Sequence, residues 1–282
     1  MLLFVLTLPE TLYPRGLSNK GGRETVSWMQ NFILHRTLHR TRNLHHTDFI
    51  RPWQMLKYPS VLLPTLYYSA SFAYGSIMFV ITSASIFGQL YHFKPYQTGL
   101  LLGIPLTVGG ILGEVLAGGF SDWISEKRAV QRGGKRKPED RLLALAPAIV
   151  LLPLGIILEG VCIQHKTHWS GVGMGIGIAS FGLQVQTTVV YAYTAEVRTS
   201  LKGVYPQKLT IQQCYRQQAA EIGLLLSLCR AVFSFSMGFY ALDLGERIGF
   251  QDAWIAFAFI IVALSIPVLA LLFVGEKWRL IS

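Results

Sequence analysis

The sequence predicts an all-α membrane protein with six transmembrane helices, on three observations. First, 51% of the 282 residues are apolar and only 14% are charged, whereas soluble domains usually carry about 25% charge. Second, six apolar segments each approach the ~20 residues that a helix needs to cross a bilayer. Third, basic residues alternate between the loops that join these segments. Open strands would leave backbone groups unpaired in lipid, so the segments are predicted to be helices.

The six predicted spans are separated by polar connections. Interior prolines such as Pro105 and Pro153 are compatible with this prediction, because membrane helices tolerate proline. The predicted boundaries are approximately 59–88, 98–122, 142–163, 170–195, 220–243 and 252–274.

Two further parts precede the first span. Residues 1–13 begin with MLLFVLTL, which is too short to cross a bilayer and lacks the basic start of a signal peptide. They are predicted to be the end of another helix. Residues 14–58 are polar and basic, and are predicted to form a cytoplasmic loop. For the histidines of this loop, a solvated basic loop is favoured over a metal site.

Lysine and arginine gather in alternate connections. All but four lie before the first span, after the second, after the fourth or in the tail 277–282. The exceptions are Lys94, Lys166 and Arg247 in the other connections, and Arg230 inside a span. Because cytoplasmic loops retain basic residues, the basic loops and the tail are predicted to be cytoplasmic. The net charge of +10 is thereby explained by basic cytoplasmic loops of a protein in the lipid bilayer, without a nucleic-acid partner.

Enzymatic motifs are missing from the sequence. It has neither a phosphate-binding glycine loop nor a nucleophile elbow. Its three cysteines show no C-x-x-C spacing, so no disulfide framework, metal site or cofactor is predicted. Ionisable residues in the spans are scattered rather than clustered, and an enzyme is therefore not predicted.

Glycines recur at a spacing of four in two of the spans. This small-xxx-small pattern lets helix backbones approach closely. Close packing is favoured, although a role as a hinge also fits the pattern. The pairs are Gly99 and Gly103, Gly109 and Gly113, Gly171 and Gly175, and Gly173 and Gly177.

Four polar residues within the spans are candidates for a transport path. Glu114 and Arg230 are ionisable groups in lipid, which are expensive and therefore candidates for function. They are predicted either to pair across the bundle or to meet a charged substrate. Gln184 and Tyr74 either line a cavity or bond to neighbouring helices, with packing slightly favoured. Glu159 lies nearer the outer surface and is predicted to be interfacial.

The end of the second span suggests a conformational clamp. The segment GGFSDWISEKRAVQRGGKRKPEDR contains Gly118, Gly119 and Asp122, followed by seven basic residues. Asp122 is predicted to pair with a loop arginine such as Arg128, or with a neighbouring helix end. The alternative is an ordinary acidic residue at the membrane interface.

Several of these segments resemble the major facilitator superfamily, specifically its fungal multidrug-type drug–proton antiporters. LPETLYPR is similar to the end of helix six, and GGFSDW with RGGKRKPEDRL to the signature between helices eight and nine. AAEIGLLLSLCRAVFSF resembles helix eleven, and GFQDAWIAFAFI the beginning of helix twelve. The resemblance implies that residues 59–276 form the carboxy-terminal half and that residues 1–13 are a remnant of helix six. It also implies that Glu114, Gln184 and Arg230 lie on helices that line the cavity between the halves.

Residues 197–213 interrupt this resemblance, since family members run directly from a sequence like YAYTAE to one like CYRQQ. The codons for Val197 and Arg198, for Leu209 and Thr210 and for Gln213 can encode a splice donor, a branch point and an acceptor. We hypothesise a retained intron, which is disordered if it is translated. A genuine basic cytoplasmic loop is the alternative.

The sequence thus predicts a secondary-active transporter fragment of the plasma membrane. The predicted activity is proton-coupled export of small organic solutes or drugs, and the predicted partner is a separate amino-terminal six-helix half. The alternative is a non-transporting membrane remnant, or a partner subunit of a split transporter.

Overall fold

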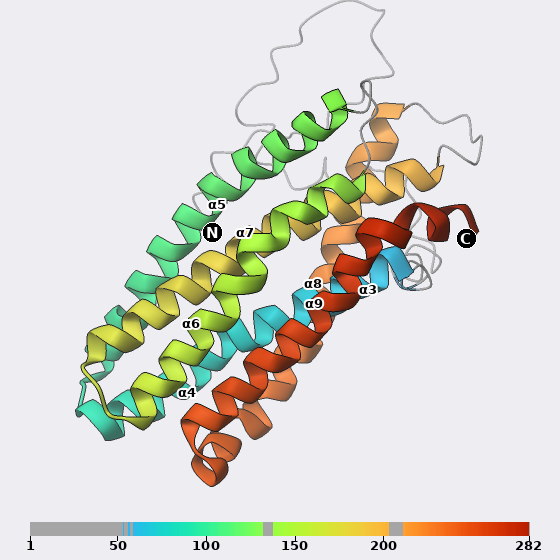
Figure 1. Ribbon diagram of the computed structural model, residues 1–282. Coiled ribbons are helices and arrows are strands. Elements are labelled where there is room, and N and C mark those ends of the chain that lie inside the picture. Colours follow the sequence, from blue (N-terminus) through green and yellow to red (C-terminus); the bar gives the residue numbers. More distant parts are fainter. Residues whose placement is uncertain (1–52, 54–55, 57–58, 132–137, 203–210, 282) are drawn as a thin grey trace, which may run out of the picture. The chain divides into compact units, whose positions relative to one another are not determined.

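The computed structural model describes residues 53, 56, 59–131, 138–202 and 211–281, and its regular structure is helical throughout (Figure 1). The predicted remnant at 1–13, and the predicted loop 14–58 apart from residues 53 and 56, lie outside this description.

The first span is an interrupted helix. It consists of α3 (Pro59–Phe72), the π-helical turn η4 (Ala73–Ile77) and α4 (Met78–Tyr91). A Cβ atom added at Gly75 would lie 2.6 Å from the Leu152 side chain, so this turn brings the backbone close to the next layer. The helix bends by 51° between Pro59–Ser83 and Ser85–Tyr91. This bend lies beyond the π-helical turn, at a serine-rich site, and sharp bends are typical of Gly/Ser sites.

The remaining predicted spans also fall within helices. These are α5 (Pro95–Gln131), α6 (Ala146–Gln164), α7 (Trp169–Lys202), α8 (Ile211–Ile248) and α9 (Phe250–Ile281), with the 3₁₀-helix η5 (Pro138–Leu145) leading into α6.

Helical backbone extends into the segment proposed to be a retained intron. Residues 197–202 continue α7 and residues 211–213 begin α8, while residues 203–210 lie outside the described residues. The intron hypothesis therefore stays a prediction. In the same way, α9 runs on through most of the predicted tail 277–282.

The number of spans supported by length and composition is four or five in the described part of the chain. Four stretches qualify alone, and the bent pair Pro59–Tyr91 gives a fifth if it counts as one span. Helix α7 is not among them, because its glycines, glutamines and threonines lower its mean hydropathy. The protein is thus a multi-pass membrane protein, but the predicted count of six is not confirmed.

The α5–α7 contact depends on small residues at every fourth position. The buried positions of α5 include Gly109, Gly113, Ala117, Ser121 and Ser125. This is the spacing of the ridges that interlock in the commonest class of helix packing. A Cβ atom at Gly113 would lie 2.8 Å from the Phe181 carbonyl oxygen, so the two backbones touch.

The predicted close packing at the glycine pairs is confirmed for three pairs and wrong for one. Close packing is confirmed for Gly109 and Gly113, which face α7, and for the two α7 pairs, which face α5 and α6. It is wrong for Gly99 and Gly103, where an added Cβ atom would meet nothing within 4 Å. The reason is that these two residues lie on a face of α5 that no described neighbour covers.

Two hydrogen bonds join three short connections at one end of the bundle. The Tyr91 hydroxyl donates to the Thr167 carbonyl at 2.8 Å, and the Phe250 amide donates to Gln164 Oε1 at 2.9 Å. The connections 92–94, 165–168 and 249 therefore share one end (Figure 1). It is the end that carries Lys94, Lys166 and Arg247, as the alternation of charge predicts.

Candidate functional site

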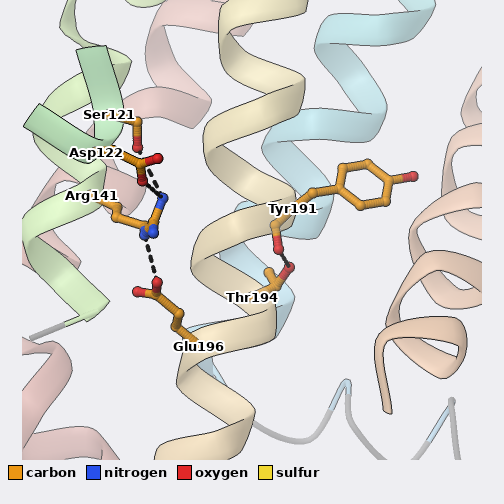
Figure 2. A network of polar contacts seen from close by, with 6 residues as sticks. All are labelled: Ser121, Asp122, Arg141, Tyr191, Thr194 and Glu196. Carbon is orange, nitrogen blue, oxygen red and sulfur yellow. Dashed lines mark hydrogen bonds and ion pairs between the residues drawn. The ribbon is translucent and has the colours of Figure 1, made fainter. Parts of the chain in front are cut away.

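Arg141 holds three elements together at the other end of the bundle. Its Nε donates to Glu196 Oε1 of α7 at 2.6 Å, and its Nη1 lies 3.0 Å from Asp122 Oδ1 of α5. The same Nη1 donates to Ser121 Oγ at 3.3 Å. Figure 2 shows these groups converging on the guanidinium, which η5 supplies. We call Ser121, Asp122, Arg141 and Glu196 the Arg141 network.

The two acidic arms of the Arg141 network differ in their exposure. The Arg141 side chain is 17% exposed, Glu196 is 40% exposed and Asp122 is 70% exposed. Charge-assisted hydrogen bonds are strong when they are sheltered and weak when water competes for them. The Glu196 arm is therefore the firm one, and the Asp122 arm is the one that opens more easily.

Asp122 thus pairs with Arg141, one of the seven basic residues that follow it, and its role as a clamp stays a prediction. Arg128 instead lies 3.5 Å from Asp140, which is buried at the start of η5. Gly118 and Gly119 do not join the network, since a Cβ atom at either would meet nothing within 4 Å. Of the residues assigned to the clamp, the structure therefore brings only Asp122 to the network.

Glu114 and Gln184 meet on the α5–α7 interface. The Gln184 amide donates to Glu114 Oε2 at 2.6 Å, and the Thr188 hydroxyl donates to the same oxygen at 2.8 Å. Gly113 allows this contact, because it brings α5 against the Phe181 backbone and the Gln184 Cβ atom. The carboxyl thus has two neutral donors and remains exposed at the helix surface. The alternative that Glu114 pairs with Arg230 is wrong among the described contacts.

Arg230 lies instead against α3. Its Nη1 donates to the Tyr68 hydroxyl at 3.3 Å, and its guanidinium carbon lies 4.3 Å from the centre of the Phe72 ring. Tyr191 of α7 packs edge-on against Tyr68 at 5.6 Å. Figure 2 shows Tyr191 pointing away from the Arg141 network, so α7 contacts the two charged regions with different faces.

Tyr74 lies near the middle of the first span. Its hydroxyl is 3.3 Å from the Tyr240 hydroxyl of α8, and its ring stacks on Phe257 of α9 at 4.9 Å. The ring itself is buried. The alternative of helix packing therefore fits Tyr74 better than an open path position.

Glu159, which was predicted to be interfacial, is buried within the protein, and its depth in the membrane stays a prediction. Its side chain is 2% exposed and accepts a hydrogen bond from Trp254 Nε1 at 3.0 Å. Gly160 lets Trp254 pack directly on α6, which closes the site over the carboxyl. No sequence pattern indicated this pair, because the two residues lie on different helices far apart in the chain.

Comparisons with known proteins agree with the membrane-spanning fold. The chain is 34% identical over 155 residues to the MFS-type transporter atr4 of Stereocaulon alpinum. The aligned stretch covers 55% of this chain and 27% of that protein. It is 25% identical over 288 residues to an uncharacterized transporter of Schizosaccharomyces pombe, over 98% of this chain and 54% of that protein.

The chain is related to the major facilitator superfamily of transporters. A further superfamily relative is a probable efflux pump, mfs2 of Aspergillus flavus, with 21% identity over 73% of this chain and 44% of that protein. The chain thus spans about a quarter to a half of the lengths of these relatives. No family model matches the chain, and no solved structure matches it significantly.

Proposed function

We propose that residues 59–276 form the six-helix carboxy-terminal half of a secondary transporter that exports small organic solutes or drugs with proton coupling. The relatives named as MFS transporters and an efflux pump support the activity. In this proposal α7 is the remaining span. Its 34 residues exceed the length needed to cross a bilayer, and its polar residues Gln186 and Thr194 are buried in the protein rather than exposed to lipid.

The observation that carries the proposal is the Arg141 network. Alternating access requires helix ends that separate and close again around a fixed site. Arg141 fastens α5 to α7 through one sheltered and one exposed carboxylate, with Asp122 as the releasable arm. Opening the Asp122 arm costs little, because water replaces the lost contact. The network therefore suits a clamp that holds one conformation and yields during transport.

Glu114 is the proposed proton group. When ionised, its Oε2 accepts from both Gln184 and Thr188 and ties α5 to α7. Protonation weakens an acceptor that serves two donors, so it loosens this contact. A proton bound from one side and released on the other would thereby be coupled to movement of α5 against α7.

Orientation and partner complete the proposal. Basic loops are retained in the cytoplasm, so the end with the Arg141 network faces the cytoplasm, and the protein resides in the plasma membrane. An amino-terminal six-helix half is the proposed partner for the other wall of the cavity.

Reconstitution tests this function. Purified chain in proteoliposomes is given a pH gradient and three fluorescent solutes of different charge: rhodamine 6G, fluorescein and 7-amino-4-methylcoumarin. We expect gradient-driven flux of at least one solute above that of empty liposomes. Glu114→Gln should abolish the dependence on the gradient. A correctly folded chain that moves none of the three contradicts the transport function.

A second candidate is a non-transporting subunit or remnant. In the proposed architecture, residues 59–276 supply one of the two halves. One half offers a single wall of a cavity that normally has two. Helical circular dichroism and normal membrane insertion without flux would favour this candidate.

A further inference from the structure

Arg230 is a cation placed deep within a membrane helix. The apolar stretch of α8 runs over Ile222–Ile248, so Arg230 lies eight residues, or about 12 Å, from its first residue at 1.5 Å per residue. The side chain is half-buried. Charged groups at such depth are costly, and they normally pair with an opposite charge or mark a ligand path.

No carboxylate pairs with Arg230 among the described residues. Its contacts there are the Tyr68 hydroxyl and the face of the Phe72 ring. A guanidinium carries five N–H donors, and stacking on a ring leaves its edge open for hydrogen bonds. Most of its donors therefore have no acceptor in the described part of the chain, unlike those of Arg141, which meet two carboxylates and a hydroxyl.

The face of α8 around Arg230 is small, polar and open. Residues at spacings of three and four form one stripe along the helix, and they are Gly223, Ser227, Arg230, Ser234 and Gly238. A Cβ atom added at Gly223 or Gly238 would meet nothing within 4 Å. One turn beyond Arg230, the buried Ser234 hydroxyl has no hydrogen-bond partner among the described residues. An unused hydroxyl thus lies one turn from the unpaired charge, and the two open glycine positions lie about 10–12 Å from it along the helix.

We propose that Arg230, with the hydroxyls of Tyr68 and Ser234, binds the anionic group of an amphiphilic organic acid. A carboxylate matches the flat guanidinium edge with two parallel hydrogen bonds, and Tyr68 keeps its own hydroxyl proton to donate. The Phe72 ring contacts the apolar body beside the guanidinium. This inference rests on the proposed transport function and narrows its substrate class to organic anions.

An acidic side chain of a partner half is the competing occupant of this site. It would neutralise Arg230 permanently and leave no preference for anionic ligands.

The test compares two probes of equal shape. The full chain in phosphatidylcholine nanodiscs is titrated at pH 7 with 1-naphthylacetate, and separately with its neutral amide, 1-naphthylacetamide. Empty nanodiscs give the background. We expect the carboxylate to bind roughly 10-fold more tightly or better, as for hydrogen bonds between charged groups. Arg230→Gln should bring the ratio of the two affinities to about one, while affinity for the amide stays unchanged.

Arg247→Gln is the matched control. It removes the same charge from the same helix, but at the outer end, where Arg247 is exposed and pairs with Asp243 at 3.0 Å. The ratio should persist in this variant. If Arg230→Gln fails to fold, Tyr68→Phe and Ser234→Ala should each lower the ratio.

Equal affinity for both probes, binding of neither, or a ratio that survives Arg230→Gln would overturn the proposal. Because no flux is measured, a carboxylate preference in a chain that does not transport overturns the transport function alone.

Discussion

The α5–α7 contact and the α3–α8 contact both place an arginine between membrane helices, yet they treat it differently. Arg141 is surrounded by acceptors from α5 and α7, and small residues bring those helices into backbone contact. Arg230 meets one hydroxyl and one aromatic face, beside glycines with open space around them. An arginine whose donors all have acceptors stabilises the conformation that contains it. An arginine with unused donors instead favours the binding of an anion.

The largest expected effect comes from filling the close contact. Gly113→Leu adds a side chain where the backbone of α7 already lies within 3 Å, so the helices must separate. Overpacking of this kind costs roughly 3 kcal/mol or more. Gly238→Leu on α8 is the control, because an added Cβ atom there meets nothing. Thermal unfolding in detergent should show a large drop in Tm for Gly113→Leu only, and equal drops would contradict the contrast between the two contacts.

Removing each arginine sharpens the comparison further. Arg141→Gln removes the charge that pairs with Glu196 and Asp122, and should destabilise the fold by about 2 kcal/mol. Arg230→Gln removes an unpaired charge from an apolar helix, so stability should fall by less than about 0.5 kcal/mol or rise. Titration with dodecyl sulfate measures both. A larger loss for Arg230→Gln would mean that Arg230 serves the fold.

The smallest effects separate the two arms of the Arg141 network. Glu196→Gln should cost more than Asp122→Asn, because Glu196 is the less exposed partner and its contact is shorter. For the exposed Asp122 arm we expect under about 1 kcal/mol, and that loss should shrink in high salt. Double-mutant cycles with Arg141→Gln give the two coupling energies. The reverse order would show that Asp122 is the firm arm.

Helix positions were predictable from the sequence, because each depends on local hydropathy. The apolar runs located α5, α6, α8 and α9, and the alternation of basic residues indicated which connections share an end. Helix α7 shows where hydropathy alone is insufficient. Its polar residues lower its hydropathy, yet they are explained once their partners on neighbouring helices are known.

Partners across the bundle were less predictable. Glu114 was identified as a candidate because charge is rare in lipid, and Asp122 because it ends a span before a basic loop. Their partners Arg141 and Thr188 lie on other elements. The register between helices decides such pairs, and hydropathy does not encode it. A usable signal did exist for the α5–α7 register, in the small residues at every fourth position from Gly109 onward.

The central claim is that α7 crosses the membrane, because it joins the Arg141 network, the Glu114 contact and the packing of Tyr68. Single cysteines placed at Lys166 and Lys202, in a chain whose own cysteines are replaced, can be labelled in intact cells with a membrane-impermeant maleimide. The account predicts labelling of the Lys166 position from outside and of the Lys202 position only after permeabilisation. Labelling of both positions from the same side would contradict it.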